Sequence, residues 1–344
     1  MILPIRRTVI FALAALVIAM PRAHAKPHYH VVHTVALGAP DRWDYVLFDP
    51  ATRRVFAAHT DHTEVVDGDS GAILGRVGPL DGAHGQAVAP ELDRGFADSG
   101  RSGTVTIFDL HSLKSLATVK AGPDADALVY DPASRRAFVM NGDSGLITVI
   151  NATTGRGIAT IDAGGALEFA APDGRGALFV NLVDARAVAR IDTRTARVTA
   201  RWPVPDCMSP HGMAYDAQTR RIFTSCVDGW LDVLDAETGR VVARLPIGKG
   251  SDSVAIDEVR RLVFSANNDG TISEIRIDSA SHFEPLASIN TPKGARTMAV
   301  DPKSGRIYLL AATVLGSGPP HHPGGPPSLH FAPGSLVLLM LDPG

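Results

Sequence analysis

The sequence predicts an all-β fold, a seven-bladed β-propeller with four-stranded antiparallel blades. A repeat of about 42 residues runs along the chain, and each repeat holds short runs rich in Val, Ile, Ala, Phe and Thr between Gly, Asp and Asn turns. After residue 25, no segment shows a helical period over ten or more residues. Four short strands fill such a repeat, whereas helical repeats need long amphipathic runs.

Two anchors define the repeat, whose template VYDPASRRAFVMNGDSGLITVINATTG spans residues 129–155. Its Asp-Pro position recurs at intervals of 40 to 45 residues, at Asp49, Ala89, Asp131, Ala171, Asp216, Asp257 and Asp301. The acid or amide before its last turn recurs at Asp67, Asp109, Asn151, Asp192, Asp235, Asp278 and Asp342. These anchors predict one domain over 26–344, with blades near 43–83, 84–125, 126–165, 166–210, 211–251, 252–295 and 296–344.

The two ends of the chain predict how the ring closes. The last repeat ends after its third strand, Ser335 to Leu341, and lacks a fourth. A spare strand, His30 to Leu37 within residues 28–37, precedes the first repeat. We expect this strand to complete the last blade, because pairing the two ends removes unpaired strand edges.

Several second strands carry a common motif, each followed by a turn and a strand such as LITVIN (146–151). The motif reads FVMN (138–141), LFVN (178–181), FSAN (264–267) and IYLLA (307–311). In this the chain resembles the YVTN-repeat family of β-propellers, within the WD40-like superfamily. The resemblance implies the architecture and fits an exported bacterial protein, but it implies little about activity, since one fold hosts many functions.

The N-terminal residues 1–25 predict a cleavable secretory signal. Arg6 and Arg7 precede an apolar run over residues 9–20, and Ala23-His24-Ala25 is a small-x-small cleavage pattern. The run is shorter than the roughly 20 residues of a membrane span. We expect cleavage after Ala25 and a periplasmic or secreted mature chain, with the general secretory and twin-arginine routes both open.

The net charge of the chain limits the classes of partner that it can bind. The whole chain carries −3, and without the three arginines of the signal 30 basic residues face 36 acidic ones, which gives −6. The basic residues are scattered along the chain. This argues against nucleic acid and anionic membranes as partners, which need clustered Lys and Arg. We expect a monomer without a membrane span in its mature part.

One ring of residues is predicted at the mouth of the central channel, five positions before each Asp-Pro anchor. Its members are Asp44, His84, Asp126, Ala166, His211, Asp252 and Arg296. Six of the seven are ionisable, and the symmetry of the ring brings them toward one axis. They predict a site for a polar ligand. The alternative is that they solvate the channel and pair with one another.

A metal site is a second hypothesis for this face. Ten positions after the anchor, where most repeats have Asn, Ser or Ala, stand His59 and Cys226. His59, His84 and His211 would bind a divalent ion such as zinc, copper or nickel if their side chains met across the channel, with nearby carboxylates completing the site. No other cofactor is expected.

Two further features belong to the same face. Cys207, in the loop entering the fifth inner strand, is predicted to form a disulfide with Cys226; free thiols or thiolate ligands are the alternatives. In the last blade, residues 313–334 form a Pro/Gly-rich insertion with His321, His322 and His330. Its composition predicts an irregular, partly extended loop, either a tolerated insertion or a lid.

The leading functional hypothesis is a non-catalytic exported protein that binds a small polar ligand, a peptide or a protein on this face. The alternative is a metal-assisted hydrolase or lyase of the lactonase kind at the channel mouth. A third hypothesis is an accessory of a periplasmic redox system. No Gly-x-Ser-x-Gly motif is present. Whether the protein is an enzyme stays open at this point.

Overall fold

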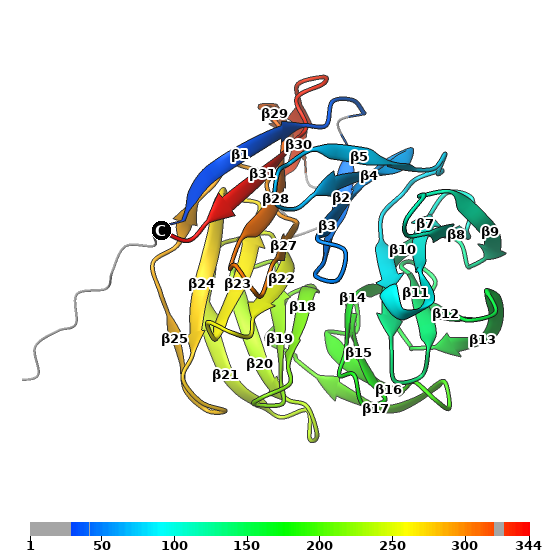
Figure 1. Cartoon of the computed structure of the whole chain (residues 1–344). Helices are drawn as coiled ribbons and strands as arrows, with labels where there is room; N and C mark the ends of the chain where they lie inside the picture. The colour runs from blue at the N-terminus through cyan, green and yellow to red at the C-terminus, as the bar shows by residue number, and fades with distance from the viewer. Residues whose placement is uncertain (1–28, 41, 320–326) are drawn as a thin grey trace, which may run out of the picture.

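The chain forms a ring of seven β-sheets around a central channel (Figure 1). The computed structural model describes residues 29–40, 42–319 and 327–344; the predicted signal, residues 1–25, lies outside them. Within these ranges the single helical element is a short 3-10 turn, η1 (Pro90–Leu92). None of the described residues belongs to a helix long and apolar enough to cross a membrane.

Each blade is a four-stranded antiparallel sheet, as predicted. The inner strands are β2 (Trp43–Asp49), β6 (Gln86–Ala89), β10 (Ala125–Asp131), β14 (Leu167–Pro172), β18 (Pro210–Asp216), β22 (Ser251–Asp257) and β27 (Met298–Val300). The second strands are β3 (Arg54–His59), β7 (Arg94–Ser99), β11 (Arg136–Asn141), β15 (Ala177–Leu182), β19 (Arg221–Cys226), β23 (Leu262–Asn267) and β28 (Ile307–Ala311). The third strands are β4 (His62–Asp67), β8 (Thr104–Asp109), β12 (Leu146–Asn151), β16 (Ala187–Asp192), β20 (Trp230–Asp235), β24 (Thr271–Ile277) and β31 (Val337–Asp342). The outer strands are β5 (Ile73–Val77), β9 (Ser115–Lys120), β13 (Arg156–Asp162), β17 (Arg197–Pro203), β21 (Val241–Pro246), β25 (Phe283–Pro285) and β1 (His30–Ala36). In blade six, β26 (Ile289–Asn290) adds a short pairing to β24.

The predicted closure of the ring is confirmed. The last sheet has the order β1-β31-β28-β27, and β1 pairs with β31 from His30 opposite Asp342 to Ala36 opposite Val337. The N-terminal strand and the C-terminal strand thus lie side by side in one blade (Figure 1). The pairing leaves the ring without an open seam between its first and last repeats.

The Asp-Pro anchors build the turn between the first and second strands. In blade three, the Asp131 carboxylate accepts hydrogen bonds from the backbone N–H groups of Ala133 and Ser134. The turn then needs a left-handed residue, and Arg135 has a φ of 54°. An aspartate that bonds backbone two and three residues on is a stable turn former. This local chemistry explains why the repeat was readable from sequence.

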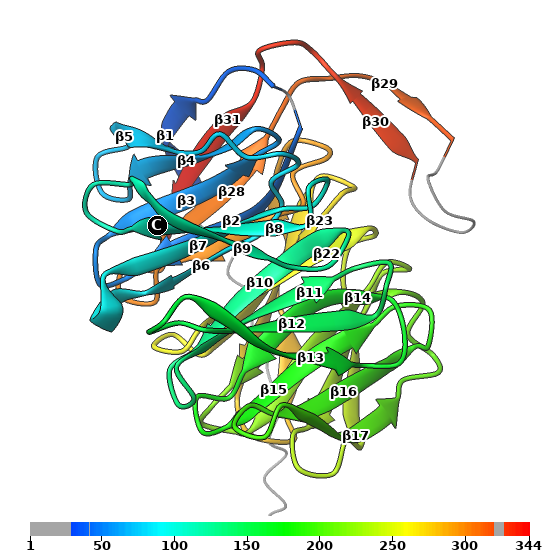
Figure 2. The same cartoon turned by 90° about the vertical axis from the view of Figure 1, so that its right-hand side faces the viewer.

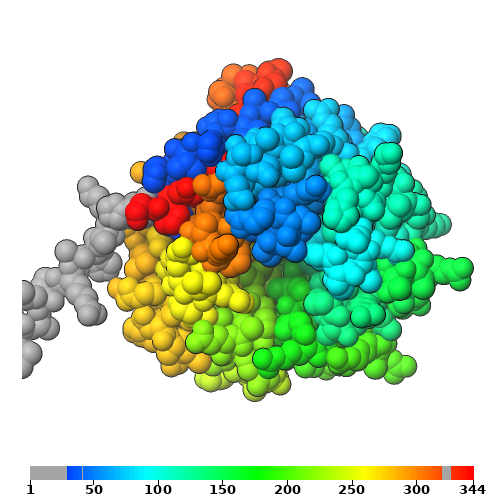
Figure 3. Space-filling view, in the orientation of Figure 1, coloured from blue at the N-terminus to red at the C-terminus, as the bar shows by residue number. Residues whose placement is uncertain are grey.

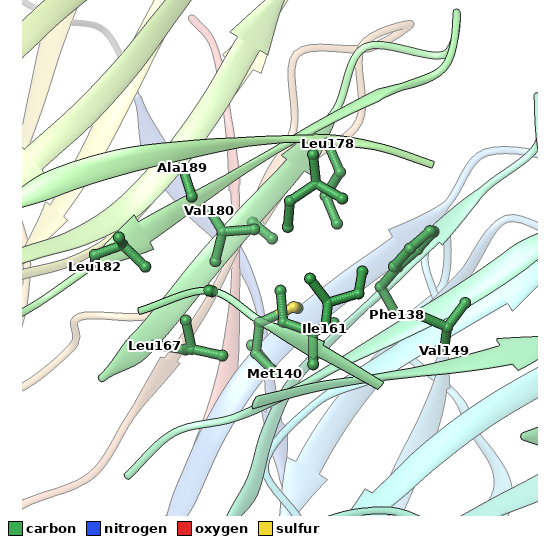
Figure 4. Packing of buried hydrophobic residues seen from close by; sticks show 14 of the residues in the cluster. Phe138, Met140, Val149, Ile161, Leu167, Leu178, Val180, Leu182 and Ala189 are labelled. Carbon is green, nitrogen blue, oxygen red and sulfur yellow. The ribbon is translucent and has the colours of Figure 1, made fainter. Parts of the chain in front are cut away.

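The core lies between the blades, because both faces of each sheet are covered. One fully buried aromatic side chain stands on every second strand: Phe56, Phe96, Phe138, Phe179, Phe223, Phe264 and Tyr308. Between blades three and four, Phe138 and Met140 pack in one cluster with Leu178 and Val180 (Figure 4). Burial of a large apolar side chain stabilises the fold by about 1.5–3 kcal/mol each, so the seven interfaces hold the ring.

The insertion of blade seven is more regular than its composition predicts. Its two arms form a two-stranded sheet of β29 (Val314–Gly318) and β30 (Ser328–Phe331), which projects from one face of the ring (Figure 2). The expectation of an irregular loop is wrong for these arms, because cross-strand hydrogen bonds tolerate glycine where no proline interrupts them. His330 lies exposed on β30, while His321 and His322 lie outside the described residues.

Candidate functional site at the channel mouth

The side chains of the ring project where the inner strands are irregular. Five inner strands carry a register shift near their N-terminal ends, and a bulge of this kind re-aims a side chain out of the ladder. The side chains at these shifts are Asp44, Asp126, Glu168, His211 and Asp252. In the other two blades, His84 and Arg296 lie two residues before shorter inner strands. All seven residues are partly exposed around the channel, which is visible as a hollow in Figure 3.

Blade four corrects the predicted ring. The turn after its inner strand is built by Asp173 rather than Ala171, because the Asp173 carboxylate accepts the N–H groups two and three residues on, as Asp131 does in blade three. Counting back five positions from Asp173 reaches Glu168, not Ala166. The rule behind the prediction holds, but the anchor was misplaced by two residues. With Glu168, every one of the seven ring positions is ionisable.

One side of the ring is centred on His84. Its Nδ1 lies 2.8 Å from Asp44 Oδ2 and 3.3 Å from Asp126 Oδ1. Burial works to lower the pKa of His84, but the hydrogen bond to Asp44 and the charges of Asp44 and Asp126 outweigh it and raise the pKa to about 10. His84 is therefore a protonated imidazolium at neutral pH, held between two carboxyl groups.

The other side of the ring is centred on Glu168. The Tyr45 hydroxyl donates to Glu168 Oε2 at 3.0 Å, and His211 Nε2 lies 3.5 Å from Glu168 Oε1. Burial, together with the charges of Asp252 and Asp44, raises the pKa of Glu168 to about 8. Since Asp44 also pairs with His84, the two sides form one electrostatic cluster. A neutral Glu168 can accept from Tyr45 and donate to His211 at once.

Arg296 supplies the permanent positive charge of the ring. Its Nε donates to Asp252 Oδ2 at 2.5 Å, and the Asp252 charge raises the pKa of the guanidinium further. The guanidinium has two more NH2 groups, and no described residue accepts a hydrogen bond from them. These groups remain available to a ligand.

Two buried acceptors position the histidine-bearing backbone, and the sequence prediction did not include them. Asp98, fully buried on β7, accepts the backbone N–H groups of His84 and Gly85, both at 2.8 Å. In blade five, Ser225 Oγ accepts the Gly212 N–H at 3.0 Å. The sequence carries one indication of this role, because Asp98 is a charged residue among the apolar residues in the middle of β7.

Each ring histidine is followed by a glycine that the packing requires. A Cβ on Gly85 would lie 2.8 Å from the backbone of the next inner strand, and a Cβ on Gly212 would lie 2.7 Å from Val254 N. Any side chain there would push neighbouring blades apart. The His-Gly pairs at 84–85 and 211–212 therefore mark places where the inner strands approach closely.

The disulfide predicted in blade five is present. Cys207 and Cys226 are bonded, with a Cα–Cα distance of 5.2 Å, so the thiolate-ligand alternative is wrong. The bridge ties the entry loop to the end of β19. Within this loop the Ser209 carbonyl accepts from His211 Nδ1 at 2.9 Å, which leaves Nε2 facing Glu168.

A cavity of about 330 Å³ lies between the ring and the insertion. Arg42, Arg101 and Arg296 line it together with Asp44 and His84. Trp43 and four residues of the hairpin arm, Pro327, Ser328, Leu329 and Phe331, also line it. The rings of Trp43 and Phe331 lie 4.7 Å apart, so this contact seats the hairpin on blade one.

The structure does not bring the three predicted metal-binding histidines together. His84 is engaged with Asp44, and His211 faces Glu168. His59 is fully buried at the end of β3 and stacks on His62 with ring centroids 4.6 Å apart. Burial lowers the pKa of His59 to about 4, so its imidazole is neutral. His59 belongs to a separate cluster in blade one.

Comparisons with known proteins identify the fold of the chain but not a family. No protein-family profile and no curated protein matches the sequence. Among solved structures, the chain is similar to Kuenenia stuttgartiensis hydrazine synthase, with a TM-score of 0.68 and 15% identity over 85% of this chain and 95% of that one. It is also similar to the WD40 repeats of RRP9, with a TM-score of 0.74 and 14% identity over 93% and 100% of the two chains. A chain of a mitotic checkpoint complex is similar as well, with a TM-score of 0.72 and 16% identity over 98% of both chains.

These similarities show that the chain has the fold of WD40 and other β-propellers. Membership of the YVTN-repeat family stays a prediction, since no family profile matches. At such identities the site must be argued from its own residues.

Proposed function

We propose that this protein is an exported, non-catalytic binding protein that holds an acidic, partly apolar peptide segment of a partner protein at the channel mouth. The cavity of about 330 Å³ beneath the β29–β30 hairpin carries the proposal. Its size lies within the range of about 300–1,000 Å³ that is typical of ligand sites.

The cationic lining favours a carboxylate ligand. Arg42 is exposed and has no hydrogen-bond partner for its side chain among the described residues, and Arg101 lies 3.6 Å from Asp81 at the surface. Asp44 is the one acidic residue of the lining, and His84 engages its carboxylate. Guanidinium groups bind carboxylates through paired N–H donors, so an Asp or Glu side chain of the partner fits between them.

The hairpin side of the cavity adds apolar surface. Trp43, Leu329 and Phe331 line the cavity together with the arginines. A ligand that carries an apolar side chain next to its carboxylate would fill both halves. The solved propellers that this chain resembles include WD40 repeats and a chain of a multiprotein complex, which supports a protein partner.

Short peptides test this proposal directly. Peptides with Asp or Glu beside Phe or Leu are compared by calorimetry with their Asn or Gln counterparts. We expect the acidic peptides to bind more tightly than the neutral ones. The double variant Arg42→Ala/Arg101→Ala should lower the affinity for the acidic peptides at least about tenfold. Equal binding of acidic and neutral peptides, or none by either, would reject the proposal.

A matched double variant controls for net charge. Arg156 and Arg197 are exposed on outer strands away from the cavity, and their replacement by alanine removes the same charge. This variant should bind the acidic peptides as the unmodified protein does. If the control variant loses as much affinity as Arg42→Ala/Arg101→Ala, the loss is due to long-range electrostatics rather than to contact in the cavity.

Export is part of the proposal, and the disulfide supports it because such bonds persist in oxidising compartments. Mass analysis of cell fractions tests it. We expect a chain beginning at Lys26 in the periplasm or medium. A chain that keeps residues 1–25 and stays in the cytoplasm would contradict export.

A metal-assisted hydrolase of the lactonase kind is the second candidate, favoured by one observation. Potential ligand atoms of Asp44, His84 and Asp126 lie within 4.8 Å of one another. Hydrolysis of simple lactones that requires an added divalent ion and is lost in Asp126→Asn would establish this candidate over the binding function.

A further inference from the structure

The turn between β3 and β4 carries a second, separate group of metal-ligating side chains. Its sequence is His-Thr-Asp-His-Thr-Glu, residues 59–64. His59 and His62 are directly opposite each other in the ladder, on either side of a two-residue turn. Potential ligand atoms of His59, Asp61 and His62 lie within 4.8 Å of one another. The hairpin thus collects two imidazoles and a carboxylate in one place.

The burial of His59 is not compensated by hydrogen bonds. His59 is fully buried, and neither of its ring nitrogens has a hydrogen-bond partner among the described residues. Leaving a buried polar atom unsatisfied costs on the order of 1–3 kcal/mol. In blade three, by contrast, the second strand ends in Asn141, which accepts the Gly122 N–H and donates to the Leu146 carbonyl. A histidine with two unpaired nitrogens at this position points to a missing ligand.

We propose that His59, Asp61 and His62 bind one divalent first-row transition ion of the zinc class. Two imidazoles and one carboxylate are a donor set that such ions prefer, whereas calcium and magnesium prefer oxygen alone. Asp61 is the exposed member, with 63% of its side chain accessible, so an ion can enter from solvent at the turn.

Glu64 acts as a positioning residue for this site. Its Oε2 lies 3.2 Å from His62 Nε2, which leaves His62 Nδ1 facing Asp61. A carboxylate that accepts the second ring N–H of a histidine ligand fixes its orientation and tautomer. Arg76 Nε in turn donates to Glu64 Oε2 at 2.9 Å and holds this carboxylate.

The site faces the interface that closes the ring. Side chains alternate along β4, so His62 and Glu64 share a face with Val66. Val66 packs in one cluster with Leu338 and Met340 of β31. A bound ion would therefore fix the β3–β4 hairpin beside the blade that joins the two ends of the chain, and would stabilise the folded state by mass action.

Zinc titration of the EDTA-treated chain, residues 26–344, tests the proposal. His321, His322 and His330 are first replaced by alanine to remove binding by the insertion. We expect calorimetry to show one zinc ion per chain and an increase in Tm on binding. Asp61→Ala and His62→Ala should each weaken binding at least about tenfold, and Glu64→Gln by about 10- to 100-fold.

Two control variants and one safeguard make the test decisive. Asp44→Asn/Asp126→Asn removes the channel carboxylates, and His111→Ala/His282→Ala removes two exposed histidines; both should bind zinc unchanged. Since His59→Ala alters the core and can prevent folding, the exposed Asp61→Ala carries the decision. Absence of saturable binding, or binding that Asp61→Ala and His62→Ala leave intact, would overturn the proposal.

Discussion

At the scale of single residues, His84 sets the charge of the channel mouth. Its pKa in the folded chain is about 10, against 6.5 for an unperturbed histidine. The charged form is therefore stabilised by folding, mainly through Asp44 and Asp126. This contribution is complete below pH 6.5 and is lost as the pH rises through 10.

The first prediction concerns how the stability of the fold changes with pH. The free energy of unfolding should fall as the pH rises from about 6.5 to 10, and the fall should be shallower in His84→Gln. Glu168, whose pKa is raised to about 8, contributes a decrease of the same sign below that pH. Burial also raises the pKa of Asp98 and of Asp126, which adds a decrease of the same sign, so the contribution of His84 is read as the difference between the slopes of the two proteins in urea unfolding. Identical slopes in both proteins would contradict the pairing.

The second prediction concerns Asp98, which accepts two buried N–H groups. Asp98→Ala leaves both unsatisfied and should cost about 2–5 kcal/mol, whereas Ser225→Ala, which frees one, should cost about 1–3 kcal/mol. Urea unfolding measures both values. A cost below about 1 kcal/mol for Asp98→Ala would show that the bonds to the His84 and Gly85 backbone do not matter for stability.

Residue identity alone predicted six of the seven ring positions as ionisable, but not the partners that set their protonation. Tyr45, Glu168 and Asp98 were missed. Their effect depends on where a bulge turns a side chain and on what a neighbouring blade brings near it, and neither is encoded in the local pattern.

At the scale of elements, blade five is tied by its disulfide. Cys207 and Cys226 are 19 residues apart in the sequence. The chain-entropy model gives about 3 kcal/mol for a loop of this length. The expectation of export and the position of the two cysteines were sufficient to predict the bond.

The third prediction is that Cys207→Ser/Cys226→Ser loses about 3 kcal/mol of unfolding free energy. Urea denaturation at fixed pH measures it. The unmodified protein under reducing conditions serves as the matched control and should lose a similar amount. A change below about 1 kcal/mol would show that the loop is held by packing instead.

At the scale of the whole molecule, stability depends on closure rather than on the insertion. Removal of β1 (His30–Ala36) exposes the edge of β31, whereas the β29–β30 sheet projects from the ring (Figure 2). The two segments therefore differ in what they support: one completes a blade, and the other covers the cavity.

The fourth prediction compares their deletions. Loss of β1 should unfold or aggregate the chain, while replacement of residues 315–330 by a short Gly-Ser linker should change Tm by only a few degrees and abolish peptide binding. Differential scanning calorimetry and peptide titration measure the two effects. A stable chain without β1, or an unfolded one without the hairpin, would contradict the closure argument.

The sequence by itself determined the number of blades, their four strands, the closure by β1 and the disulfide, because these depend on a repeated local pattern and on turn chemistry. Only the tertiary structure decided that Glu168 replaces Ala166 in the ring, that His59 joins His62 rather than His84, and that the hairpin covers a cavity through Phe331 and Trp43. Those outcomes depend on bulges and on contacts between blades distant in sequence. The repeat period places a residue on a strand, but packing decides which neighbour it meets.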